Sequence, residues 1–187
     1  AVALSDPKRA SDLVWQMHSS RWRDRAIRSL ARQLAETDCD AATSLIGLMS
    51  EPDLVHQLRS ELAATLGDRH PDLALRLLES LAPSPHRTEA AFQAGKRLLS
   101  AGGDAEQALR LAQVALDRDL ALRWLVPTLA RSQVRSPVNV AETIADPYLQ
   151  VLSLVDAAAE MSDGQARCRP VPERARQVRP IVEWEGI

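Results

Sequence analysis

The sequence is poor in the residues that build sheets. Its 187 residues include only four tryptophans, one tyrosine and one phenylalanine, and side chains branched at Cβ are also sparse. Alanine, leucine and arginine dominate instead. Because strands favour aromatic and β-branched residues, this composition argues against a sheet protein and predicts an all-α fold.

Cysteines and long apolar runs are scarce as well. Cys39 and Cys168 lie far apart and share no metal-type spacing, which argues against a disulfide scaffold or a zinc module. We therefore expect a protein of the reducing cytoplasm. No apolar run approaches the ~20 residues that a bilayer requires, so we expect no membrane span.

The chain lacks an excess of positive charge. Its 23 lysines and arginines stand against 25 aspartates and glutamates, for a net charge of -2. A phosphate backbone attracts proteins with a basic surplus, so general nucleic-acid binding is disfavoured.

What the chain does contain is a period. Apolar stretches that begin with alanine start at Ala42, Ala74, Ala108 and Ala141, at intervals of 32, 34 and 33 residues, and one period earlier lies Ala10. Such a period is typical of helical repeats, whose hairpins bury their apolar faces by stacking. A second set of amphipathic segments alternates with these stretches, at about 21–36, 53–66, 86–101, 119–131 and 147–161.

Prolines and glycines punctuate this pattern. Proline is well tolerated at the first position of a helix, and Gly67 and the pair Gly102 and Gly103 stand where helices should end. Pro127 lies inside segment 119–131, where we expect a kinked or split helix. Six further prolines stand where helices should begin: Pro7, Pro52, Pro71, Pro85, Pro137 and Pro147.

Two regions follow from the pattern. Residues 1–161 are predicted to form about five antiparallel helix pairs, stacked as an α-solenoid. Residues 162–187 show no helical stripe, contain five arginines and three prolines, and are expected to be a tail or linker. The start in mid-repeat suggests a fragment of a larger protein.

One stretch, 90–119, resembles a tetratricopeptide repeat. Gly95 matches the small residue of that repeat's first helix, Ala108 the alanine that opens its second helix, and Ala115, Leu116 and Asp119 its closing motif. The resemblance implies a right-handed solenoid whose concave surface holds peptides or partner proteins. A divergent HEAT-like repeat is the alternative, because the aromatic positions of the family hold Ala91, Leu98 and Ala112 here.

Arginines form the candidate binding site. Arg21, Arg25, Arg28 and Arg32 fall on one stripe of a predicted helix, where guanidinium groups could bind carboxylates or phosphates bidentately. An ordinary solvated face stays open as the alternative, since the chain uses 21 arginines and only two lysines. Three further cations would extend the stripe if they share its side: Arg87, Lys96 and Arg97.

Other residues give weaker signals. Trp15, Trp22 and Trp124 stand on apolar stripes and are expected in the core, while Trp184 is either a docking residue or part of a disordered tail. The histidines show no converging metal set, and no nucleophile motif is present. We therefore expect no catalysis, no metal and no cofactor.

The sequence thus predicts a non-catalytic scaffold that binds a peptide or partner protein in a concave groove, with an acidic segment of that partner as the expected ligand of the arginine stripe. Three alternatives stay open: a nucleic-acid-binding helical repeat, an enzyme built on a solenoid, and a regulatory arm of a larger multidomain protein. Repeat arrays need polar caps at their ends, so the uncapped AVAL end could also drive a homodimer.

Overall fold

The computed structural model describes residues 7–132 and 136–168, and all regular structure in these ranges is helical. The expected all-α fold is confirmed. Residues 1–4 and Trp184, which carry the predicted uncapped end and docking residue, lie outside the described residues. The elements are α2 (Pro7–Trp15), α3 (Ser20–Leu34), α4 (Cys39–Ser44), η1 (Leu45–Leu48), α5 (Pro52–Leu66), α6 (Pro71–Glu79), α7 (Pro85–Ser100), α8 (Ala105–Gln113), α9 (Arg118–Ser132), α10 (Pro137–Ala141) and α11 (Pro147–Cys168).

Local chemistry sets where these helices begin. Each of the six prolines singled out in the sequence is the first residue of a helix, where its missing N–H leaves no intrahelical bond unmade. Polar side chains also cap helix starts, both at a proline start and elsewhere. The Ser84 hydroxyl accepts a hydrogen bond from the Arg87 N–H, and the Asp104 carboxylate accepts one from Glu106 at 3.1 Å.

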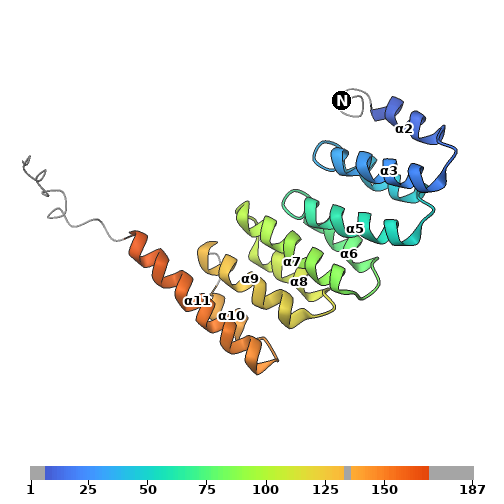
Figure 1. Ribbon diagram of the computed structural model, residues 1–187. Coiled ribbons are helices and arrows are strands. Elements are labelled where there is room, and N and C mark those ends of the chain that lie inside the picture. The colour runs from blue at the N-terminus through green and yellow to red at the C-terminus, as the bar shows by residue number, and fades with distance from the viewer. Residues whose placement is uncertain (1–6, 133–135, 169–187) are drawn as a thin grey trace, which may run out of the picture.

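The helices form two layers, as Figure 1 shows. The longer helices α3, α5, α7, α9 and α11 lie side by side in chain order, each packed on the next. Behind them lie the shorter helices, with α4 and η1 packed on α3, α6 on α5, α8 on α7 and α10 on α9. The three central long helices, α5, α7 and α9, thus each contact their own short helix and both neighbouring long helices.

Small residues allow the two layers to approach closely. The four period-marking alanines, Ala42, Ala74, Ala108 and Ala141, have no exposed surface and stand one in each short helix. A side chain built on Gly95 of α7 would lie 3.2 Å from the carbonyl oxygen of Ala108. The alanine period in the sequence therefore marks the positions where the layer of shorter helices packs against the layer of longer helices.

Helices α9 and α11 each run past a residue where the sequence allows a break or predicts an end. Helix α9 runs through Pro127 without being split, although proline removes one hydrogen bond to the carbonyl of Arg123; packing of its neighbours Val126 and Leu129 in the core outweighs that loss. Helix α11 continues past residue 161, where the sequence pattern ends, to Cys168. Within the described ranges, none of the helices combines the length and hydropathy needed to span a lipid bilayer.

Candidate functional site

Three of the four stripe arginines meet in one place on α3. Arg25, Arg28 and Arg32, together with Ser29 and Gln33, line an open hollow of about 720 Å³, which we call the α3 hollow. Arg21 lies apart from it, in a separate hollow beside Asp24 and the start of α5. The structure therefore groups three cations and two neutral hydrogen-bonding side chains on one helix face.

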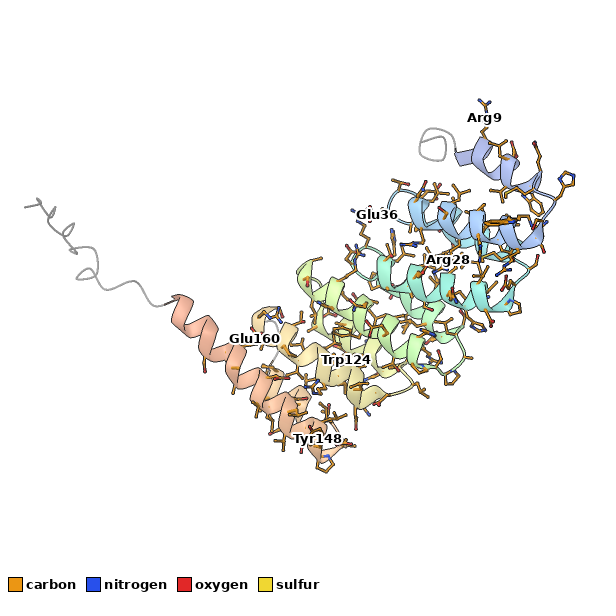
Figure 2. All side chains as sticks on the ribbon, viewed as in Figure 1. Arg9, Arg28, Glu36, Trp124, Tyr148 and Glu160 are labelled. Carbon is orange, nitrogen blue, oxygen red and sulfur yellow. The ribbon has the colours of Figure 1, made fainter. Side chains whose placement is uncertain are left out.

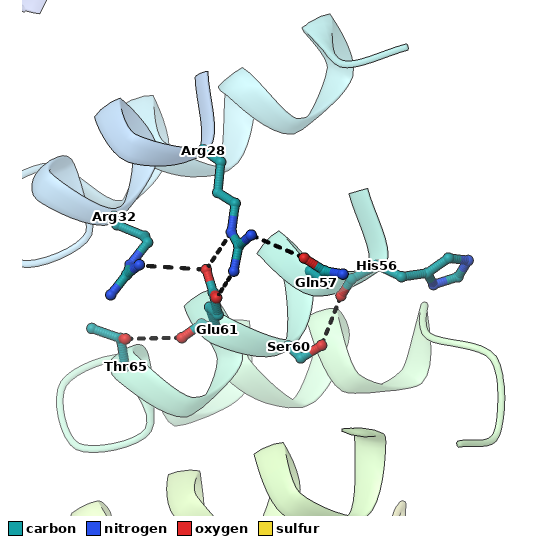
Figure 3. Close-up of polar contacts among 7 residues, drawn as sticks. All are labelled: Arg28, Arg32, His56, Gln57, Ser60, Glu61 and Thr65. Atoms are coloured by element: carbon teal, nitrogen blue, oxygen red, sulfur yellow. Dashed lines mark hydrogen bonds and ion pairs between the residues drawn. The ribbon is translucent and has the colours of Figure 1, made fainter. Parts of the chain in front are cut away.

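Arg28 is tied to the next long helix (Figure 3). Its Nε donates to Glu61 Oε2 of α5 at 3.0 Å, its Nη2 donates to the other carboxylate oxygen, and its Nη1 donates to the Gln57 side chain at 2.9 Å. The hydrogen bonds to Glu61 raise the pKa of Arg28 above its usual value, despite the opposing effect of partial burial. Arg28 is therefore a charged structural link between α3 and α5.

Glu61 is the carboxylate that Arg28 and Arg32 share. Arg32 Nε lies 3.9 Å from Glu61 Oε2, the oxygen that also accepts from Arg28 Nε, and the Arg32 side chain remains 64% exposed. Arg25 makes no ion pair within the part of the chain that the structure describes. The α3 hollow thus keeps a positive surplus that Glu61 leaves unbalanced.

Trp22 lies on the surface, so the expectation that it is a core residue is wrong. Its side chain is 59% exposed, and the Arg25 guanidinium lies 5.0 Å from its ring centroid, a cation–π contact. The buried face of α3 is carried by Ile27, Leu30 and Leu34. At 100° per residue Trp22 falls about 120° from the middle of that face, beside Arg25.

The other two described tryptophans differ from each other. Trp15 is 55% exposed near the end of α2, so the expected core position is wrong for it as well. Trp124 on α9, labelled in Figure 2, is half-buried, and its ring centroid lies 5.2 Å from that of Phe92. Trp124 therefore contributes to the packing of α9 on α7.

The three cations of α7 do not extend the α3 hollow. Arg87 donates to the Leu81 carbonyl at 3.0 Å, Lys96 lies 5.7 Å from the Phe92 ring, and Arg97 lies 4.0 Å from Asp68. Helix α5 stands between α3 and α7 (Figure 1). Each of these side chains has a local contact of its own instead of a place in one basic groove.

Sequence reasoning missed the ion pairs between successive long helices. Arg28 and Glu61 are 33 residues apart, and so are Arg123 and Asp156, which lie 3.6 Å apart between α9 and α11. A second pair on the same two helices joins Arg131 to Glu160 at 3.1 Å. Opposite charges one period apart were the signal that could have revealed the first two pairs; Arg131 and Glu160 are 29 residues apart and do not follow the period.

Asp24, which has no exposed surface, was also not singled out from the sequence. Its Oδ2 accepts hydrogen bonds from the backbone N–H groups of Ser50 and Glu51, at 2.8 and 2.7 Å, just before α5 begins. Asp119 holds the start of α11 in the same way, through two N–H groups at 2.9 Å. These carboxyl groups cap the next long helix from outside and fix its position.

Titratable side chains elsewhere do not gather into a metal centre. Within residues 7–132 and 136–168, no three or more histidine, cysteine, aspartate or glutamate side chains converge as metal ligands would. Comparison with known proteins assigns no family or function, because no family model, curated protein or solved structure matches the chain. The α3 hollow therefore remains the strongest candidate on geometric grounds.

We expect the Arg28–Glu61 pair to contribute modestly to stability. Its side chains are about 30% exposed, so a double-mutant cycle with Arg28→Ala and Glu61→Ala should give a coupling free energy of about 0.5–1 kcal/mol. High salt should reduce that coupling, since the pair is partly screened. Urea titrations of the wild type, the two single variants and the double variant at low and high salt measure the coupling and its salt dependence. A coupling near zero at low salt would show that the pair does not stabilise the fold.

Proposed function

We propose that the protein is a non-catalytic scaffold of the cytoplasm that binds an acidic segment of a peptide or partner protein at the α3 hollow. The observation that carries this proposal is the unbalanced group of Arg25, Arg28 and Arg32 beside the exposed ring of Trp22. No cofactor enters the proposed activity.

The chemistry of the hollow favours carboxylates. Arg28 is already occupied by Glu61, while Arg25 and the mostly exposed Arg32 can each present a planar guanidinium to an incoming carboxylate. Charge-assisted hydrogen bonds of this kind are roughly twice as strong as neutral ones. Trp22 adds apolar area, so an acidic residue next to a leucine-like side chain fits best.

The fold supports the same role. We propose that the stack is a right-handed α-solenoid of about five helix pairs, similar to tetratricopeptide repeats. The alternation of long and short helices, the fully buried alanines and the close approach of Gly95 to Ala108 support this. Solenoids of this kind hold their surfaces ready for extended partners with little rearrangement.

Nucleic acid is the second candidate, because a tryptophan beside arginines can also stack on a base. The two partners differ in their response to salt. Affinity for a phosphate backbone falls steeply and log-linearly with salt, whereas a peptide held by two or three charges loses less. The net charge of -2 favours the peptide.

Binding can be measured by fluorescence anisotropy with a labelled peptide rich in glutamate and leucine. The same peptide with glutamine in place of glutamate serves as a control ligand, and oligouridine serves as the nucleic-acid ligand. For Arg25→Glu/Arg32→Glu we expect affinity for the acidic peptide to fall at least about tenfold. The exposed arginines of α6 and α9 provide a matched control, Arg76→Glu/Arg118→Glu, with the same change in net charge.

The control variant should bind as the wild type does. Equal losses of affinity for the acidic peptide in the two variants would show that overall charge causes the effect, and would contradict a site on α3. Preference for oligouridine with a steep salt dependence would replace the peptide with nucleic acid as the ligand.

A further inference from the structure

The outer face of α11 carries an uncharged stripe. Tyr148, Val151 and Val155 are 59–71% exposed along it, and Ala158 and Ala159 are exposed about one turn after Val155. At 100° per residue these side chains and the half-buried Leu152 lie within about 60° of Val155. We call these six residues the α11 stripe: Tyr148, Val151, Leu152, Val155, Ala158 and Ala159.

On α9, the preceding long helix, the equivalent face is covered by other helices. Asp117 and Asp146 accept hydrogen bonds from the first turns of α9 and α11, so residues can be matched by their distance from these caps. The α9 residues five, nine and twelve positions after Asp117 are at most 2% exposed and lie under α10 and α11. The α11 residues at the same distances from Asp146 are exposed. The buried residues are Leu122, Val126 and Leu129, and their exposed equivalents are Val151, Val155 and Ala158.

We propose that the α11 stripe is a homodimer interface, in which two copies of the chain pack α11 against α11 in antiparallel orientation about a two-fold axis at Val155. This surface is distinct from the α3 hollow at the other end of the stack (Figure 2). A second copy fits because a two-fold contact must be self-complementary: Val155 at the axis meets its own symmetry mate, and every other part of the stripe meets a different part of the same stripe.

The order of side chains along α11 meets this condition. With the axis at Val155, Leu152 of one copy faces Ala158 of the other, and Val151 faces Ala159, so that large residues meet small ones. Tyr148 then faces Ser162, an exposed residue one turn beyond the stripe. Small side chains at half of the contacts let the two helices approach closely, as ridges of one helix fill grooves of the other.

Charge does not oppose this pairing. The six stripe residues are uncharged, and the acids beside the stripe, Asp156 and Glu160, are directed to α9, where they pair with Arg123 and Arg131. One helix face is smaller than the ~800 Å² per partner of a standard interface. We therefore expect a reversible dimer with a dissociation constant in roughly the micromolar range.

Sedimentation velocity over a range of concentrations tests the proposal on the full chain. The wild type should pass from monomer to dimer, and Val155→Glu should raise the dissociation constant at least about tenfold, because it places two like charges at the axis. Gln113→Glu, at an exposed residue of α8, is the control and should dimerise like the wild type. Far-UV circular dichroism should show all three folded, since both substituted residues are exposed.

Cross-linking places the contact without relying on a loss of binding. In a Cys39→Ala/Cys168→Ala background, Val155→Cys should be joined to its symmetry mate by a short bismaleimide, and Gln113→Cys should not. A wild type that is monomeric at every concentration overturns the proposal, whatever covers the stripe. So does a dimer that survives Val155→Glu and fails to cross-link at residue 155, which would move the contact to another surface such as that of exposed Trp15.

Discussion

Gly67→Ala is expected to lower the free energy of unfolding by about 3 kcal/mol. Gly67 ends α5 where that helix meets α7, and a Cβ there would lie 2.4 Å from the carbonyl oxygen of Ala94 and 2.5 Å from its Cα. The obstructing atoms belong to the backbone, so no side-chain rotation can relieve the clash. Helix α7 would have to move away from α5.

The control for this prediction is Gly47→Ala. A Cβ at Gly47 meets no atom within 4 Å, so this substitution should leave stability unchanged or raise it slightly by restricting the unfolded chain. Urea unfolding followed by far-UV circular dichroism compares the two. Similar stabilities for both variants would contradict the close approach of α5 and α7.

Asp24→Ala is expected to cost a similar amount, about 3 kcal/mol. The substitution removes a fully buried carboxyl group and leaves the N–H groups of Ser50 and Glu51 without their acceptor at the start of α5. Asp119→Ala removes the same kind of cap at α11, where the hydrogen bonds are exposed. Water can replace that acceptor, so we expect a loss of only about 1 kcal/mol.

Hydrogen exchange adds a local readout for this pair of variants. Asp24→Ala should speed exchange in the first turn of α5 and leave the α9–α11 junction unchanged, because helical stacks are stabilised by contacts between neighbours. Equal losses of stability in Asp24→Ala and Asp119→Ala would contradict the distinction between a buried and an exposed cap.

The sequence predicted the fold better than the site, for physical reasons. A proline at the first position of a helix acts locally, so the starts of α5, α7 and α11 could be predicted from the chain itself. The alanine period reflects close helix approach at every repeat, so it too is visible in the sequence. Both signals depend on a residue's own position and need no knowledge of its partners.

The side chains around α3 depend on their partners, which the sequence does not show directly. Trp22 was expected in the core because it falls in the apolar half of a helical wheel, but the face that α3 buries is narrower than that half. Arg28 was predicted to be free for a ligand, whereas Glu61 on the next long helix binds it. The pairing depends on how two helices are staggered, and this stagger follows from packing rather than from composition.

The most direct test of the proposed role of the α3 hollow is a charge swap. Arg25→Glu/Arg32→Glu is titrated with the glutamate- and leucine-rich peptide and with the same peptide carrying lysine in place of glutamate, beside the wild type. We expect the wild type to bind the acidic peptide, and we expect the variant to lose the acidic peptide and to bind the basic one. Retention of the acidic peptide by the variant, or failure of the wild type to bind it, would contradict a carboxylate-binding site on α3.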